Sequence, residues 1–271
     1  MQGLRVALVH EWLISWGGSE SVLLSLARLF PDAPIFTSVY SPDARVREIF
    51  DGRDIRASAL QRIPGIKSLY RATLPLMPWA FGRMDLSGFD LVISSSHAFA
   101  KSVRVSPGAI HLCYCHTPPR YLWDLYESYN PGLLGALRGP LLRRLKRKDV
   151  EAANRVHTFV ANSTFVADRI SRTYERDATV IYPPVDVDQF ISSDVDGTHY
   201  LAGGRMVNYK RINIAIEAAM LLHEHGVAAG VVSLPYRELF DAQPAEYQKS
   251  VLPPEATARV SIETALTLGW E

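Results

Sequence analysis

Residues 4–20 read LRVALVHEWLISWGGSE, and this stretch decides the fold class. Leu4–Val9 is apolar apart from Arg5, which is typical of a strand buried on both faces of a parallel sheet. A polar loop with the paired glycines Gly17 and Gly18 follows, and Glu20–Phe30 then has apolar positions at helical spacing until a proline ends the helix. A strand, a glycine-bearing loop and a helix in this order predict the first βα unit of an α/β domain.

The same alternation continues along the first two thirds of the chain. Asn162-Ser163-Thr164 has the residue types of a helix cap and predicts a helix that runs to about Tyr174. Alternating strands and helices predict a Rossmann-like parallel sheet with right-handed crossovers. The further expected strands are 33–39, 90–94, 110–115, 156–161 and 178–182.

Composition narrows the function class. The chain has 271 residues, 48% hydrophobic, and a net charge of +1, which is ordinary globular composition and gives no support for a nucleic-acid partner. Two cysteines, Cys113 and Cys115, exclude a disulfide framework and favour a reducing compartment. Met1–Gly3 leads straight into a strand, and no apolar run reaches the ~18 residues of a spanning helix. We therefore expect a cytoplasmic protein.

The chain divides at a proline pair. Residues 1–183 are predicted to form the Rossmann-like domain, and the polar, aperiodic stretch 184–198 a linker. Residues 199–271 are predicted to form a small partial α/β domain, with a strand at 200–202, a helix at 212–223 and a strand at 227–233.

His116 is the strongest candidate for chemistry in the first domain. It lies just past the expected strand 110–115, and open α/β sheets bind ligands at the carboxyl ends of their strands. A histidine there can donate to a sugar hydroxyl or to a leaving group, although a strand-end histidine satisfied by backbone is the alternative. Zinc at Cys113, Cys115 and His116 is disfavoured because these are too few ligands, and the alternating cysteines fit one packed strand face.

Two other loops are weaker candidates. Ser95 and His97 follow the strand 90–94 and either line a pocket or cap a helix. Gly17 and Gly18 precede a helix whose N-terminus favours an anion, with Ser19 as the expected N-cap. The alternative for the glycine pair is a plain tight turn.

Two basic clusters complete the candidates. Arg205 and Lys210 follow the strand that ends at Gly203-Gly204, and a guanidinium and an ammonium group at this spacing suit a diphosphate. The run 142–148 (LRRLKRK), with Leu137, Leu141 and Leu145, predicts a basic amphipathic helix. Such a helix either contacts an anionic membrane surface or is a solvated face.

The motifs together resemble retaining GT-B glycosyltransferases of family 4, in a mannosyltransferase-like branch that builds bacterial polysaccharides. The resemblance covers residues 1 to about 219, through VALVHEWL, GGSESVL, DLVISSSHAFAK, CYCHTPPRYLWDLY, VANSTFVADRI and YLAGGRMVNYKRINIAIEA. Pro119 departs from the family pattern, in which methionine is usual.

The resemblance implies a reaction and a set of roles. A sugar, expected to be mannose-like, would pass from a nucleotide-diphosphate sugar to a glycan or lipid-linked acceptor, with no cofactor. His116 would lie beside the transferred sugar, and Gly17, Gly18, Arg205 and Lys210 would bind the donor diphosphate. The acceptor side of the pocket would be lined by Ser95, His97, Arg120 and Tyr121.

The C-terminal stretch resembles a different family. Residues from about 227 to 271, with VVSLP, ELFDAQ, YQKSVLP and LGWE, are similar to the C-terminal domain of transketolase, and the join falls within 214–226. No thiamine diphosphate motif accompanies this segment, so transketolase activity is not expected. Because the family 4 donor domain is then incomplete, two hypotheses remain: a glycosyltransferase, or a non-catalytic chimera that acts at most as a binding module.

Overall fold

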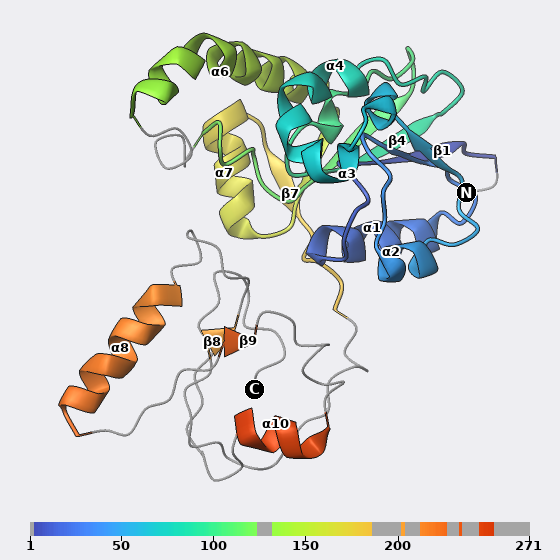
Figure 1. The fold of residues 1–271 in the computed structure, drawn as a ribbon. Coiled ribbons are helices and arrows are strands. Elements are labelled where there is room, and N and C mark those ends of the chain that lie inside the picture. The colour runs from blue at the N-terminus through green and yellow to red at the C-terminus, as the bar shows by residue number, and fades with distance from the viewer. Residues whose placement is uncertain are drawn as a thin grey trace. The chain divides into compact units, whose positions relative to one another are not determined.

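The computed structural model describes residues 3–123, 132–185, 202–203, 212–226, 233–234 and 244–251, and the chain divides into two compact units, residues 1–185 and 186–271. The first unit is built on a seven-stranded parallel sheet in the order β3-β2-β1-β4-β5-β6-β7 (Figure 1). The predicted parallel α/β fold is confirmed. The strands are β1 (Val6–His10), β2 (Ile35–Thr37), β3 (Ile55–Ala57), β4 (Leu91–Ser96), β5 (Ile110–Cys115), β6 (Thr158–Ala161) and β7 (Ala178–Val180).

Helices cover both faces of this sheet (Figure 1). Because side chains alternate along a strand, Val6 and Leu8 of β1 pack with α1 and α2, whereas Ala7 and Val9 face α3, α4 and α6. The helices are α1 (Gly18–Leu29), α2 (Ala44–Ile49), α3 (Ile66–Leu69), α4 (Met77–Phe81), α6 (Gly132–Ala153) and α7 (Thr164–Tyr174), with short 3-10 helices η1 (Ala59–Arg62), η2 (Tyr70–Leu76) and η3 (Ala100–Ser102).

Two helix starts test the capping predictions. Ser163 caps α7 as expected, since its Oγ accepts from the backbone N–H of Val166 at 3.2 Å. The prediction for Ser19 is wrong: α1 begins at Gly18, and its N-cap is Gly17 in an extended conformation with no side-chain cap. Ser19 lies inside the first turn and donates its hydroxyl to Glu20 Oε2 at 3.0 Å instead.

A buried ion pair holds the long helix α6 to the rest of the unit. Lys101 Nζ, on η3, lies 2.5 Å from Asp149 Oδ1 on α6, and both side chains are inaccessible to solvent. Asp149 Oδ2 also accepts from Trp123 Nε1 at 2.9 Å and from the Tyr174 hydroxyl at 2.7 Å. This fully bonded carboxylate therefore joins η3, α6 and α7 in one polar contact.

The second unit contains the expected strand–helix–strand order. β8 (Ala202–Gly203) pairs in parallel with β9 (Ser233–Leu234), and α8 (Ile212–Glu224) lies between them in sequence. The predicted helix 212–223 is thus present. A further helix, α10 (Ala245–Val251), was not foreseen.

Candidate functional site

The candidate site lies where the strand order reverses. The chain runs from β1 outward to β2 and β3, and then returns to place β4 on the other side of β1. In open parallel sheets this switch point opens a crevice at the carboxyl ends of the strands, where ligands bind. His10 ends β1 opposite Ser95 of β4, and His116 follows the last residue of β5.

A chain of hydrogen bonds links these residues. Ser95 Oγ lies 3.1 Å from His10 Nδ1 and 2.8 Å from His116 Nε2. The other nitrogen of His10, Nε2, lies 3.3 Å from Glu20 Oε1 on α1. His10, Glu20 and Ser95 are buried, and His116 is half-buried at the open end of the chain. The register of β1 against β4 produces the first contact, since His10 and Ser95 are direct partners.

The environment keeps the outer histidine uncharged. Burial is the main cause that lowers the pKa of His116 to about 3. His97 packs edge-on at 4.8 Å from the Trp12 ring and 6.3 Å from His116, and burial lowers its pKa as well. Its Nδ1 is buried with no hydrogen-bond partner in the described part of the chain. Neutral imidazoles offer one donor and one acceptor each, which suits sugar hydroxyls.

Glu11 shapes the loop that carries His97. Its Oε1 accepts from Ser96 Oγ at 2.9 Å and from the backbone N–H groups of His97, Ala98 and Ala100 at 3.2, 2.7 and 2.9 Å. One carboxylate oxygen thus fixes the turn after β4. Glu11, His10 and Glu20 were not among the predicted site residues, although all three lie in the stretch 4–20 that predicts the first βα unit.

The two glycines at the start of α1 have different surroundings. A Cβ added to Gly17 would lie 3.0 Å from Glu20 Oε2, whereas one added to Gly18 would meet nothing within 4 Å. Burial alone would raise the pKa of Glu20, but the hydrogen bond and charge of His10, its own backbone N–H and Ser19 together lower it. The positive end of α1, which was expected to face a diphosphate, is therefore partly occupied by a carboxylate.

The remaining first-unit candidates lie close to β5. Arg120 is exposed, and the hydroxyl of Tyr121 is buried with no hydrogen-bond partner among the residues described. Burial near Glu11 and Asp149 raises the pKa of Tyr121 well above its usual range. Thr117 Oγ1 accepts a hydrogen bond from Arg169 of α7, a buried cation that was not among the predicted site residues.

The last residues singled out in the sequence are the two cysteines of β5 and the two cations of the second unit. Cys113 and Cys115 are free, buried and packed in one cluster with Phe159, which accounts for their alternation along β5. Within the described ranges no group of three or more His, Cys, Asp or Glu side chains is placed to hold a metal ion. Arg205 and Lys210 lie outside the described residues, so their predicted diphosphate contacts stay predictions.

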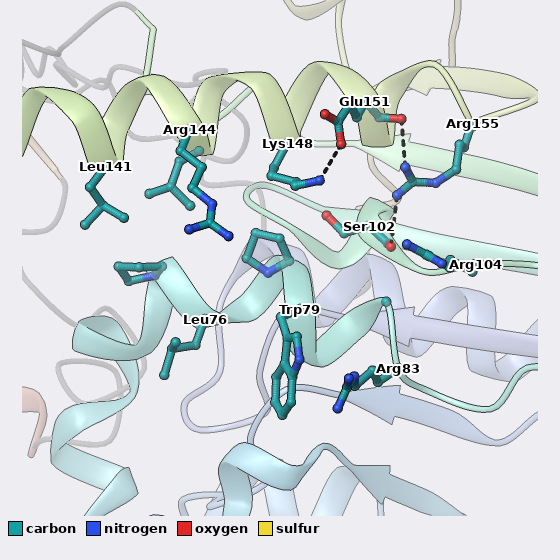
Figure 2. A pocket seen from close by; sticks show the side chains of 14 residues that line it. Leu76, Trp79, Arg83, Ser102, Arg104, Leu141, Arg144, Lys148, Glu151 and Arg155 are labelled. Atoms are coloured by element: carbon teal, nitrogen blue, oxygen red, sulfur yellow. Dashed lines mark hydrogen bonds and ion pairs between the residues drawn. The ribbon is translucent and has the colours of Figure 1, made fainter.

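A groove of about 810 Å³ lies away from this site, between α4 and α6 (Figure 2). The exposed side chains of Leu76, Trp79 and Leu141 line it. Its basic side chains come from three segments, and Glu151 is the one acidic residue among the lining residues. The cationic lining residues are Arg83, Arg104, Arg144, Lys148 and Arg155.

The groove changes the interpretation of the basic run 142–148. Leu142 and Leu145 pack into the core, so the apolar side of this helix does not form the free face that an amphipathic surface helix requires. Arg144 and Lys148 instead line the groove, where Lys148 Nζ donates to Glu151 Oε2 at 2.7 Å (Figure 2). None of the helices in the described ranges is both long and apolar enough to span a bilayer.

Comparison with known proteins assigns the first unit to a family. A family model described as Glycosyltransferase Family 4 matches residues 16–189, more than half of the chain. The chain belongs to Glycosyltransferase Family 4. The match contains α1, Ser95, His97, His116 and α7 but begins after β1 and His10, and it confirms the resemblance drawn from the sequence.

A second model, described as Transketolase-like TK C-terminal domain, matches residues 210–271. Transketolase from Halalkalibacterium halodurans is 44% identical over 59 residues, which are 22% of this chain and 9% of that enzyme. Chloroplastic transketolase from Solanum tuberosum is 50% identical over 60 residues, 22% of this chain and 8% of that enzyme. The chain thus spans less than a tenth of these curated relatives. The match also starts before α8, earlier than the predicted join.

Among solved structures, Anabaena HepE in complex with UDP and glucose has a TM-score of 0.49 and 16% sequence identity, and the match covers 96% of this chain and 70% of that one. Because this score is low, the fold assignment depends on the sheet topology and the family match.

Proposed function

We propose that the chain is a retaining hexosyltransferase of the GT-B type, which moves a mannose-like sugar from a nucleotide-diphosphate sugar to a glycan or lipid-linked acceptor. The observation that supports this is the uncharged, half-buried imidazole of His116 at the switch point of a family 4 sheet. Placed beside the transferred sugar, His116 would hydrogen-bond a hydroxyl. Ser95, His97, Arg120 and Tyr121 are proposed to line the acceptor side.

The departing diphosphate needs positive charge. Electrostatic stabilisation of a leaving group is commonly the largest catalytic term in group transfer. We assign this role to Arg205 and Lys210, with Gly17 and Gly18 leaving room for the diphosphate near α1. Because the Glu20 carboxylate lies at the start of α1, the two cations are expected to matter more than the helix terminus.

Donor binding and turnover test this proposal together. Binding and hydrolysis of GDP-mannose and UDP-glucose would be measured for the full chain and for Arg205→Ala, Lys210→Ala and His116→Ala. We expect each arginine or lysine variant to weaken donor binding about tenfold or more, as loss of a charged hydrogen-bond partner does. His225→Ala, at an exposed histidine that directly follows α8, is the control and should change neither quantity. Absence of donor binding by the unmodified chain would disprove the donor site.

The alternative is a non-catalytic binding module, and the transketolase-like match over 210–271 is the observation that favours it. Donor binding without hydrolysis or transfer to any acceptor would support that alternative. It would leave the fold and the family assignment unchanged.

We also propose that the groove between α4 and α6 is the point of peripheral contact with an anionic membrane surface. Its five cations attract lipid phosphates, and the exposed indole of Trp79 suits the interface between headgroups and acyl chains. Burial and the charge of Arg104 lower the pKa of Arg155, although the charge of Glu151 opposes this shift.

Sedimentation with vesicles tests this contact. We expect binding to phosphatidylglycerol vesicles, no binding to phosphatidylcholine vesicles, and loss of binding at high salt. Arg144→Ala should weaken binding by about 1 kcal/mol, and the adjacent Arg143→Ala, which removes the same charge outside the groove, should have a smaller effect. Equal effects of the two variants would show that the net charge of the helix, not the groove, binds lipid.

A further inference from the structure

Ser95 lies between two imidazoles, with His10 Nδ1 on one side and His116 Nε2 on the other. A serine hydroxyl has a single proton to donate and two lone pairs to accept. It can therefore donate to only one of these nitrogens, and the other nitrogen must then carry its own proton. The hydrogen-bonding states of the two histidines are linked through one atom.

Glu20 fixes the far side of His10. The Glu20 carboxylate is held ionised by its hydrogen bonds, and an ionised carboxylate only accepts. Nε2 of His10 must therefore carry a proton whenever it bonds to Glu20. Only Nδ1 of His10, which faces Ser95, is left to gain or lose a proton.

Two states of the chain follow. With His10 neutral, Ser95 donates to His10 Nδ1 and accepts from Nε2–H of His116, so Nδ1 of His116 is an acceptor. With His10 charged, His10 Nδ1–H donates to Ser95, whose proton turns to His116 Nε2, and the neutral His116 then carries its proton on Nδ1. One proton on His10 thus exchanges the roles of the two His116 nitrogens.

We propose that Glu20, His10 and Ser95 are positioning residues that decide whether the outward nitrogen of His116 accepts or donates a hydrogen bond. Within the described part of the chain, no hydrogen bond occupies Nδ1 of His116. The inference rests on the proposed function in one respect, namely that this nitrogen faces a substrate oxygen. The charged state of His10 would suit an oxygen that must accept, and the neutral state a hydroxyl that donates.

Other charged groups lie near this chain of hydrogen bonds. The charges of Glu11, Glu20 and Lys101 act on His97, and the charge of Glu20 also acts on His116. Glu11 is bonded to backbone N–H groups, and Lys101 is paired with Asp149. Burial lowers the pKa of His97 and favours its neutral form.

Nitrogen NMR of the full chain, labelled at its histidines, tests the coupling without any activity measurement. Chemical shifts distinguish protonated from unprotonated ring nitrogens, and spectra would be followed from about pH 5 to about pH 8. We expect neutral His10 always to coincide with protonated Nε2 on His116, and charged His10 with protonated Nδ1. The opposite pairing at any single pH, or a His116 tautomer that is the same for neutral and for charged His10, would overturn the proposal.

Three variants separate the coupling from general structure. In Ser95→Ala the tautomer of His116 should no longer follow His10, whereas Ser95→Thr keeps a hydroxyl and should restore the link. Ser94→Ala is the matched control, because Ser94 is the adjacent buried serine of β4 but bonds His111 at 2.9 Å. Coupling that survives in Ser95→Ala would disprove the role of Ser95. If the chain transfers no sugar, the NMR result still decides the coupling, so the two proposals fail independently.

Discussion

The two units of the chain differ in whether the predicted fold and the matched family agree with each other. In residues 1–185 the predicted strands form one parallel sheet, and His10, Ser95 and His116 meet at the switch point. A single family model covers this unit from residue 16 onward. In residues 186–271 the helix and strand pattern also holds, but the matched family is a different one. Strand–helix periodicity therefore predicts an α/β unit without identifying the ancestry of that unit.

The stretch between the two family matches sharpens the contrast. The glycosyltransferase match ends at residue 189 and the transketolase-like match begins at residue 210. Arg205 lies between the two matches, and Lys210 is the first residue of the second. The predicted diphosphate site, formed by Arg205 and Lys210, thus lies outside the residues that the glycosyltransferase model matches.

The largest expected effect concerns the first unit alone. Asp149→Ala leaves Lys101 buried without its partner, and loss of one member of a buried pair lowers the free energy of unfolding by about 3–5 kcal/mol. Denaturant unfolding followed by tryptophan fluorescence measures this change. Glu246→Ala, on the exposed surface of α10, should change stability by no more than about 0.5 kcal/mol. Comparable losses in the two variants would contradict the role of the pair.

The next effect separates catalysis from stability. If the first unit transfers sugar, His116→Ala should lower kcat by at least about a hundredfold while the midpoint of unfolding changes little. Steady-state turnover and thermal unfolding on the same preparation measure both quantities. Parallel loss of turnover and stability would show that His116 is structural.

A third test uses pH. Burial, together with the charges of His157, Arg155 and Lys101, lowers the pKa of His111 to about 3, below the value of about 6.5 in an unfolded chain. The unfolded state therefore binds the extra proton first, so stability is complete above about pH 6.5 and falls as the pH drops toward 3. At about pH 5 this histidine alone contributes a loss of about 2 kcal/mol.

His111→Gln is the variant for this test, because it keeps a hydrogen-bonding group near Ser94 but does not titrate. Unfolding free energies between about pH 7 and about pH 5 should change less in His111→Gln than in the unmodified chain. An identical slope in both proteins would assign the acid sensitivity to other groups.

The smallest effect compares two adjacent glycines. Gly17→Ala places a Cβ 3.0 Å from Glu20 Oε2 and should lower the free energy of unfolding by about 1 kcal/mol through displacement of the carboxylate. Gly18→Ala meets open space in the first turn of α1 and should be neutral or slightly stabilising. Equal values for both variants would mean that Gly17 is not packed against Glu20.

The sequence predicts the sheet better than it predicts the site. Runs rich in apolar residues locate β1, β4, β5 and β6, because strands buried on both faces carry few polar residues. The edge strand β3 was missed because its residues are largely exposed and include Arg56. Spacing alone also does not reveal that Ser19 lies inside α1, since a glycine N-cap leaves no side-chain signal.

For the site, His116, His97 and Ser95 were identified because they follow strand ends. Their partners His10 and Glu20 were missed because contacts between β1, β4 and α1 depend on strand order and register, which the local pattern does not specify. Glu11 was missed for the same reason, since it bonds a loop that lies far from it in the sequence.

The short segment 96–102 belongs to two surfaces at once. At one end it carries His97 beside His116, and at the other the carbonyl of Ser102 accepts from Arg155 in the wall of the groove. Lys101 and the backbone N–H of Ala100 anchor it in between. We therefore expect evolutionary drift to be slowest here, and a set of homologues should show 96–102 varying less than the α4 side of the groove, since an altered residue in this loop would disturb both neighbours together.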